Sequence, residues 1–393
     1  MTSQLKRDRN ALIGQHEPKK DFSLMHSTRT YAAAAAIAVL AGCQMAPQTP
    51  DPTGRADADM LRVLTAFQAS GAQPIAKLTV EQARTQPTPG DAAVTVAQQI
   101  GLPGKLPIAK VIVTQVQGAA GMLPARVYDP GLARGPAPVI LYFHGGGWVT
   151  GNLDTYDASD RALAQGTGAI VLSVQYRLGP ERRFPAAQDD ADASYAWLVQ
   201  NAASIGGDAK QIALAGESAG GNLAIDAAIW ARDQHLPAPV HQLLVYPVVG
   251  TDLETPSYKE TTNAVPLNRA AITWYVEHFT NGPADLKDTR LNVVGAADLH
   301  GLPPTTIVSA EIDPLRSEGE ALAQKLRVSG IAVEQRTYPG VMHEFFGMGA
   351  VVGRAKQAED FAAMRLKASF IQPMAMTSAP SVPRHRAMRR HAG

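Results

Sequence analysis

A serine flanked by glycines is the strongest chemical signal in the sequence. Residues 216–221 read Gly-Glu-Ser-Ala-Gly-Gly and lie between a strand-like segment at 211–215 and a helical segment. A Gly-x-Ser-x-Gly pattern in this context is typical of a nucleophile elbow, a tight turn that exposes the serine hydroxyl above a sheet. The glycines let the strand and the helix approach each other closely at that turn. Ser218 is therefore the candidate nucleophile, and the Ala219 amide is a candidate donor to an oxyanion.

Three successive glycines form a second signal. Residues 144–148 read His-Gly-Gly-Gly-Trp and follow a run of apolar, strand-like residues. Because glycine carries no Cβ atom, its backbone amide is unobstructed and can point at a developing oxyanion. Two such amides, together with that of Ala219, could stabilise one oxyanion. A phosphate-binding loop would need the spacing of a Walker or dinucleotide motif, which this segment lacks.

A serine nucleophile needs a base, and the base needs a carboxylate to orient it. After a nucleophile elbow, the chain order is serine, acid, histidine. Of the histidines that follow the serine, only His343 comes closely after a predicted strand; the others are expected at the surface. Asp313 follows the strand-like segment 305–310 and is the candidate acid, with Glu311 as its nearest competitor. His144 is expected to anchor the glycine loop by hydrogen bonding rather than to act as the base.

The elements that must position these residues alternate along the chain after residue 105. Strands are predicted at 110–117, 123–129, 138–143, 169–175, 211–215, 242–246, 305–310 and 333–338. Helices are predicted near 156–165, 187–201, 219–232, 317–329 and 354–369. Strands that alternate with helices indicate a mostly parallel sheet covered on both faces, and the first strands, joined without helices, are expected at an antiparallel or mixed edge. Such sheets carry their sites at the carboxyl ends of the strands, where the candidate residues fall.

These motifs together resemble one known family. The serine and glycine motifs are joined by Tyr-Arg-Leu-Gly-Pro-Glu at 176–181 with Phe-Pro-Ala at 184–186, and by Asp-Pro-Leu-Arg at 313–316. In this order, and with the turn at His343, they resemble the hormone-sensitive-lipase family of α/β-hydrolases, bacterial esterases with a His-Gly-Gly-Gly loop. The resemblance runs from about residue 123 to residue 370. The chain departs from the family pattern at Ser317, where an acidic residue is usual, and at Gly179, where alanine is usual.

The resemblance implies an α/β-hydrolase fold with a mostly parallel eight-stranded sheet, helices on both faces and a small helical cap. It further implies that Ser218 is the nucleophile, His343 the base and Asp313 its orienting acid. By the same resemblance, Gly145, Gly146 and Ala219 would donate the oxyanion-hole amides, although Gly147 could replace Gly145. The expected reaction is hydrolysis of carboxylic esters with short to medium acyl chains, through an acyl-enzyme and without a metal or organic cofactor. An amidase or lactonase with the same triad remains an alternative, as does a ligand receptor without catalysis, although a receptor would be expected to lack a triad member. Glu217 is expected to form a salt bridge with the cap or to lie exposed at the elbow.

The catalytic domain is predicted at 105–371, with cap helices at 56–104 and a cap insert at about 250–299. The insert holds four aromatic residues that could line an apolar acyl pocket or pack the core of the cap itself: Tyr258, Trp274, Tyr275 and Phe279. A small cap of this kind suits short or medium acyl chains better than long triglycerides.

The chain ends and the overall composition concern location and partners. The formal net charge of +1 over 393 residues gives no bulk attraction to nucleic acid, and the single cysteine excludes an intrachain disulfide. Residues 1–43 are predicted to be a leader, with Met25 rather than Met1 as the suspected start. Its alanine-rich run ends in Leu-Ala-Gly-Cys, which resembles a lipobox. The alternative is a buried alanine-rich helix, but residues 44–55 read as a linker rich in proline and polar side chains.

We therefore expect an exported protein that faces the periplasm or the cell exterior and is anchored to the membrane through acylated Cys43. A cytoplasmic protein is the alternative if the leader is not processed. The substrate is expected to be a small ester, with no nucleic-acid partner. Residues 372–393 are predicted to be a disordered basic tail.

Overall fold

The computed structural model describes residues 49–371. The chain divides into two units at residue 47, and all of the described residues belong to the second unit, which begins at Gln48. The leader, Cys43, the first part of the linker (44–48) and the basic tail at 372–393 lie outside the described residues.

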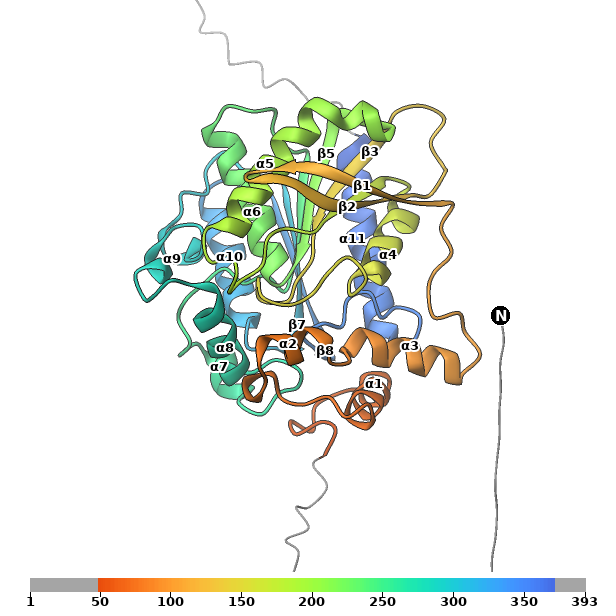
Figure 1. The fold of residues 1–393 in the computed structure, drawn as a ribbon, viewed down its shortest axis with the longest axis vertical. Coiled ribbons are helices and arrows are strands. Elements are labelled where there is room, and N and C mark those ends of the chain that lie inside the picture. The colour runs from red at the N-terminus through yellow and green to blue at the C-terminus, as the bar shows by residue number, and fades with distance from the viewer. Residues whose placement is uncertain (1–48, 372–393) are drawn as a thin grey trace, which may run out of the picture. The chain divides into compact units, whose positions relative to one another are not determined.

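An eight-stranded sheet forms the centre of the described chain (Figure 1). Its spatial order is β1-β2-β4-β3-β5-β6-β7-β8. β2 runs antiparallel to both of its neighbours, and the remaining pairs are parallel. The strands are β1 (Lys110–Gly118), β2 (Gly121–Asp129), β3 (Ala137–Phe143), β4 (Ile170–Val174), β5 (Gly207–Glu217), β6 (His241–Val245), β7 (Thr305–Ile312) and β8 (Val333–Met342). The predicted sheet, including its antiparallel edge, is confirmed.

Two layers of helices cover this sheet (Figure 1). α4 (Asp157–Thr167) and α11 (Gly353–Ile371) pack on one face, and α5 (Ala186–Asn201), α6 (Ala219–Asp233) and α10 (Arg316–Val328) pack on the other. Side chains of the buried strand β3 pack against both helical layers. Leu141 belongs to the apolar cluster with α5 and α6, while the adjacent Ile140 belongs to the cluster with α4 and α11. This alternation follows from the two-residue period of a strand.

Short helices lie at the end of the sheet where α1, α2 and α3 are seen in Figure 1. They are α1 (Ala58–Ala69), η1 (Ile75–Lys77), α2 (Val80–Thr85) and α3 (Pro89–Gln99), followed in the insert by α7 (Pro256–Glu260) and α8 (Arg269–Phe279). The insert also contains η3 (Asp285–Lys287) and α9 (Val293–Ala296), and α9 lies beside α10 (Figure 1). η2 (Ala202–Ile205) connects α5 to β5. The two sets touch each other, because the Trp274 indole of α8 donates a hydrogen bond to the Leu78 carbonyl at 3.1 Å.

Capping side chains explain where the N-terminal helices begin. The Asp57 carboxylate accepts the Met60 amide at the start of α1. Thr79 opens α2 and Thr88 opens α3, each in a capping box. Such caps satisfy amide groups that a short helix leaves without an internal partner. The cap helices predicted at 56–104 are three separate α-helices, with the short 3-10 helix η1 between the first two.

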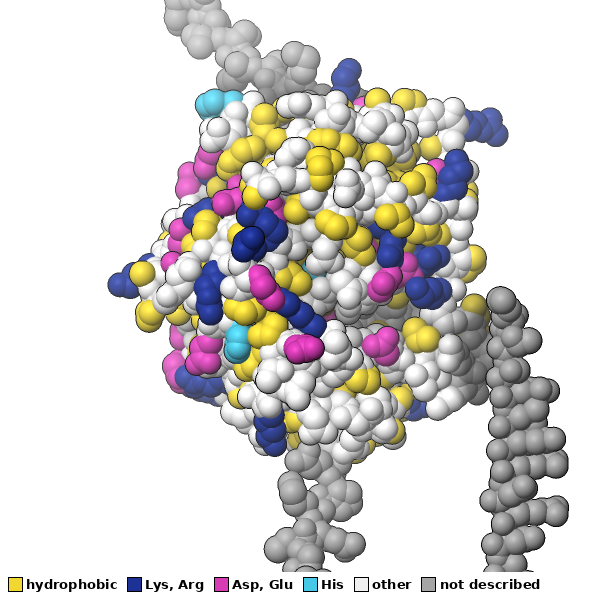
Figure 2. All heavy atoms as spheres, viewed as in Figure 1, with side chains coloured by type: hydrophobic (Ala, Val, Ile, Leu, Met, Phe, Trp, Pro, Cys, Tyr) yellow, Lys and Arg dark blue, Asp and Glu magenta, His cyan; other side chains and the backbone are white. Residues whose placement is uncertain are grey.

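The surface mixes charges of both signs. Figure 2 shows basic and acidic side chains interspersed across the visible face, with apolar side chains gathered over β1 and β2. The exposed apolar residues of these strands are Val111, Ile112, Val113 and Met122. Within residues 49–371, no helix combines the length and the apolar character that a membrane span needs.

Candidate active site

Ser218 occupies a sharp turn between β5 and α6. Its backbone has φ 56° and ψ −117°, a conformation that residues other than glycine rarely adopt. A Cβ atom at Gly216 would collide with the carbonyl of Gly220, and a Cβ at Gly220 would collide with the carbonyl of Phe143. Both glycines are therefore required by close backbone approach. The turn presents the Ser218 hydroxyl to a cavity at the carboxyl end of the sheet.

The hydroxyl belongs to a chain of hydrogen bonds that joins three distant loops. The Ser218 Oγ atom lies 3.0 Å from His343 Nε2, and His343 Nδ1 lies 2.7 Å from Asp313 Oδ2. The other carboxylate oxygen of Asp313 accepts the Leu315 amide at 2.8 Å, which fixes the acid in place. Burial lowers the pKa of His343, but the nearby Asp313 carboxylate outweighs this effect, so the pKa lies above its ordinary value. The structure thus brings all three sequence-predicted residues together.

The competitors for the acid and base positions lie elsewhere. Glu311 pairs with Arg55 at 2.9 Å and accepts the Gly340 amide, so its carboxylate is engaged away from the histidine. His241 was expected at the surface, and this expectation is wrong. It is buried at the start of β6, where its ring nitrogens lie 2.9 Å from the hydroxyls of Thr306 and Ser369.

His144 anchors the glycine loop, as its position suggested. Its ring is buried and stacks on Tyr176 with 4.4 Å between the ring centroids, and its Nδ1 atom lies 2.8 Å from the Gly145 carbonyl. The Tyr176 hydroxyl donates to the His144 carbonyl at 2.8 Å. Burial lowers the pKa of His144 to about 4, so the ring is neutral near neutral pH and packs as an uncharged group.

The three glycines after His144 occupy different surroundings. Gly146 and Gly147 line the cavity, with φ values of 96° and 58°. Gly145 lies behind them, where a Cβ atom would collide with the Tyr156 hydroxyl and come within 3.0 Å of the Glu217 carbonyl. The geometry therefore favours Gly147 over Gly145 as a partner of Gly146 at the cavity wall.

Glu217 supports the site from behind the nucleophile. Its carboxyl is buried and accepts hydrogen bonds from Tyr142 at 2.5 Å and from Tyr246. The Tyr246 ring in turn contacts the His343 ring, with centroids 4.5 Å apart. Both sequence-based interpretations of Glu217, as a salt-bridge partner of the cap and as an exposed residue, are wrong. Burial raises its pKa to about 7, because the surrounding tyrosines stabilise the carboxylate less than water would.

Glu344 is a site residue that the sequence reasoning missed. Its Oε1 atom lies 3.9 Å from His343 Nε2, and both carboxylate oxygens accept from the Tyr156 hydroxyl, at 2.8 and 3.0 Å. Burial raises the pKa of Glu344. Its position directly after the histidine was the only signal in the sequence, since Tyr156 lies far away along the chain.

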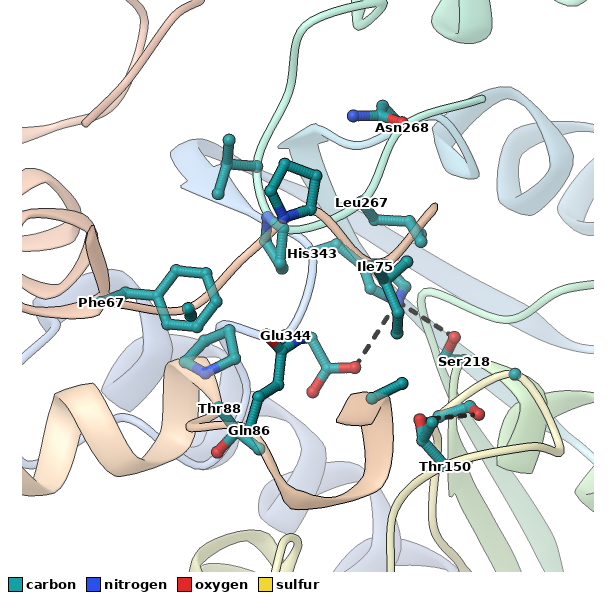
Figure 3. A pocket seen from close by; sticks show the side chains of 18 of the residues that line it. Phe67, Ile75, Gln86, Thr88, Thr150, Ser218, Leu267, Asn268, His343 and Glu344 are labelled. Carbon is teal, nitrogen blue, oxygen red and sulfur yellow. Dashed lines mark hydrogen bonds and ion pairs between the residues drawn. The ribbon is translucent and has the colours of Figure 1, made fainter. Parts of the chain in front are cut away.

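A cavity of about 240 Å³ opens at these residues (Figure 3). Its apolar lining comes mostly from the N-terminal helices and the insert, and includes Leu64, Phe67, Ile75, Leu267, Ile272 and Val276. Of the four aromatic residues predicted to line an acyl pocket or to pack the cap, only Tyr275 lines the cavity. The other three, Tyr258, Trp274 and Phe279, are buried in apolar clusters. Among the described residues, no group of three His, Cys, Asp or Glu side chains is arranged to hold a metal ion.

A serine on a strained turn, an imidazole and a buried carboxylate, held in this order at the carboxyl ends of parallel strands, define a serine hydrolase. Comparison with known families agrees: residues 140–347 match the model of the alpha/beta hydrolase fold. The chain belongs to the α/β-hydrolase esterases of the hormone-sensitive-lipase type and is a serine carboxylesterase. The predicted family and fold class are thereby confirmed.

Individual relatives are similar over most of the catalytic region. A carboxylesterase of Mycobacterium tuberculosis, NlhH, is 44% identical over 240 residues, which cover 60% of this chain and 75% of the relative. An ethyl acetate hydrolase of Pseudomonas putida is 37% identical over 241 residues, with the same coverage of 60% and 75%. Among solved structures, the Pyrobaculum calidifontis esterase has a TM-score of 0.71 at 34% identity, covering 77% of this chain and 97% of that one. A thermostable esterase from Pseudomonas putida has a TM-score of 0.72 at 31% identity, covering 81% and 99%.

Proposed function

We propose that the enzyme hydrolyses carboxylic esters with short to medium acyl chains through a covalent acyl-enzyme on Ser218. The observation that carries this proposal is the hydrogen-bond chain from Ser218 through His343 to Asp313, with distances of 3.0 and 2.7 Å. A serine hydroxyl is a weak nucleophile at neutral pH and needs an adjacent base to accept its proton. His343 is that base, and the buried Asp313 carboxylate already orients its ring.

In the first half of the reaction, His343 Nε2 takes the proton of Ser218 as the oxygen attacks the ester carbonyl. The carbonyl oxygen becomes an oxyanion, which the amides of Gly146, Gly147 and Ala219 stabilise. Gly145 supports this loop and does not donate to the oxyanion, because it lies behind the cavity wall. His343 then gives its proton to the alcohol oxygen, the ester C–O bond breaks, and the alcohol leaves.

In the second half, water enters the site that the alcohol has vacated. His343 removes a proton from this water as its oxygen attacks the acyl carbon of the Ser218 ester. Collapse of the second tetrahedral intermediate releases the carboxylic acid and returns the proton to Ser218. Asp313 stays ionised throughout and stabilises the imidazolium that forms in each half.

The size of the cavity supports the preference for short to medium acyl chains. A volume of about 240 Å³ with a mainly aliphatic lining accommodates a small ester, whereas a long fatty acyl chain would have to extend into solvent. One relative in the comparison is named for the hydrolysis of ethyl acetate, a small ester. We therefore expect activity to fall as the acyl chain lengthens.

The test is hydrolysis of p-nitrophenyl esters from acetate to palmitate by the full chain. Wild type is expected to cleave the short esters fastest, and Ser218→Ala is expected to lose at least about 10³-fold in kcat, since the nucleophile is gone. Thermal unfolding of both proteins provides the control for folding. Equal turnover by a folded Ser218→Ala protein would contradict the proposal, and cleavage of anilides but not esters would replace the esterase with an amidase.

A further inference from the structure

The cavity holds a second carboxylate next to the catalytic histidine, and the proposed mechanism does not use it. In Figure 3 the Glu344 carboxylate and the Ser218 hydroxyl both approach the same edge of the His343 ring. The Glu344 Oε1 atom lies 3.9 Å from His343 Nε2, beyond hydrogen-bond distance, while Ser218 Oγ lies at 3.0 Å. Glu344 is therefore close to the reacting atoms without competing for the proton of the serine.

The backbone at Glu344 has a conformation that is unfavourable for a residue other than glycine. Its φ of 72° lies in the left-handed region, which glycine adopts freely and a glutamate rarely adopts. A residue in such a conformation persists where its surroundings fix it, and these positions cluster at functional sites. Here the turn is closed by the Phe345 amide, which donates to the Met342 carbonyl at 3.2 Å, and the next two side chains are buried.

The carboxylate is also held in one direction. The Tyr156 hydroxyl donates to its two oxygens at 2.8 and 3.0 Å, and this hydroxyl lies against Gly145 of the glycine loop. A carboxylate offers about four acceptor positions, and a single hydroxyl hydrogen occupies only one of them. The Glu344 side chain keeps 22% of its surface accessible and lines the cavity, so the remaining acceptor capacity faces the space that a substrate fills.

The location of these unoccupied acceptor positions indicates which part of the substrate Glu344 would contact. His343 Nε2 must reach the oxygen of the departing alcohol, because it supplies the proton for that group. Glu344 Oε1 lies beside the same nitrogen, so it is near the carbons of the alcohol that follow the ester oxygen. The geometry points to Glu344 as the residue that binds a hydrogen-bond donor on the alcohol portion of the substrate. The favoured substrates are then esters of diols, polyols or amino alcohols, an inference that rests on the esterase function proposed above.

A matched pair of substrates tests this inference on the full chain. 2-Hydroxyethyl butyrate and propyl butyrate differ by a hydroxyl in place of a methyl group. Wild type is expected to favour the hydroxyethyl ester by about tenfold in kcat/KM, the effect of one hydrogen bond to a charged group. Protonated 2-(dimethylamino)ethyl butyrate forms a second arm, which distinguishes an ammonium donor from a hydroxyl donor.

The variants are Glu344→Gln, which removes the charge, and Glu344→Gly, which also suits the left-handed backbone. Both are expected to reduce the ratio of kcat/KM for the hydroxyethyl ester to kcat/KM for the propyl ester by several-fold or more, mainly through KM for the hydroxyethyl ester. Glu277→Gln, at an exposed glutamate of α8, is the matched control and is expected to keep the wild-type preference.

The possible results separate this inference from the esterase function. An unchanged preference in both variants, or a slowing of all butyrates by the same factor, would show that Glu344 does not bind the alcohol and would overturn the inference. Wild type that prefers the propyl ester would overturn it too. If wild type cleaves neither butyrate nor any p-nitrophenyl ester, the proposed function itself fails.

Discussion

The residues that act on the substrate are supported by a buried layer of tyrosines and acids. Tyr246 connects Glu217 to the ring of His343, and Tyr156 connects Glu344 to the glycine loop. Glu217 and Tyr246 lie behind the nucleophile, whereas Tyr156 and Glu344 line the cavity. Burial raises the pKa values of both carboxyls, that of Glu217 to about 7, so Glu217 changes charge near neutral pH.

At the scale of single residues, Asp313→Asn separates the role of the acid from that of its neighbour. An amide cannot stabilise the imidazolium or fix the tautomer of His343, so kcat for p-nitrophenyl butyrate is expected to fall by about 10³–10⁴-fold. Glu311→Gln, at the residue paired with Arg55, is the matched control and is expected to retain activity. Comparable losses in the two variants would contradict the assignment of Asp313.

The pH profile provides an independent readout of the same pair. His343 acts as a base only when neutral, and its pKa lies above the ordinary value of 6.5. The acidic limb of kcat/KM in wild type is therefore expected to have its midpoint above pH 6.5, with activity rising as the pH rises through it. In Asp313→Asn the residual activity should have this midpoint at lower pH, since the carboxylate that favours the imidazolium is absent. A midpoint that does not move would assign the limb to another group.

At the scale of elements, one ion pair fastens α2 to the catalytic domain. Arg84 donates to both carboxylate oxygens of Glu181 at 2.7 Å, and also to the carbonyls of Val149 and Gly179. The hydrogen bonds from Arg84 lower the pKa of Glu181 to about 2. A lowered acid pKa stabilises the folded state fully above the ordinary pKa of 4.5, and this contribution is lost as the pH falls toward 2.

Removal of this contact should loosen the wall of the cavity. Arg84→Ala is expected to lower the free energy of unfolding by about 1–2 kcal/mol, chiefly through the two carbonyls left without their donor. It should also raise KM for p-nitrophenyl butyrate and speed proteolysis within residues 49–99. Arg62→Ala removes an exposed pair within α1 and is the control. If both variants have the same KM as wild type, α2 does not depend on this contact for its position.

The sequence predicted the strands and helices of the catalytic domain closely, because alternating and apolar patterns there reflect burial in one sheet. The largest differences are β5, which begins at Gly207, and β8, which extends to Met342. The sequence could not predict how the N-terminal helices dock, because pairs such as Arg84 with Glu181 join segments far apart in the chain. The contact of Tyr156 with Glu344 could not be predicted either, because these two residues are also far apart in the chain. At Gly179, the unusual glycine is explained by space, since a Cβ atom there would lie 2.9 Å from the His278 carbonyl.

At the scale of the whole molecule, we propose that the enzyme is exported and anchored through acylated Cys43, in keeping with the run Leu-Ala-Gly-Cys at 40–43. In a bacterial host, wild type is expected to incorporate a fatty-acid label and to sediment with membranes. Cys43→Ser should lose the label and keep its esterase activity, while Ser218→Ala should keep the label. Intact mass gives the opposing result: a mature chain that still contains residues 30–42 would exclude the lipoprotein. The intact mass of the Cys43→Ser chain, which lacks the cysteine needed for this cleavage, would show whether synthesis begins at Met1 or at Met25.

The catalytic groups and the cavity wall come from different parts of the chain. The groups that react with the substrate follow β5, β7 and β8, whereas much of the wall is formed by residues that precede β1. Mutations in that leading segment can therefore reshape the space around the substrate while the machinery of proton transfer stays intact. Such a division makes the N-terminal segment the natural place for substrate range to diverge during evolution, and a suitable target for exchange between related enzymes.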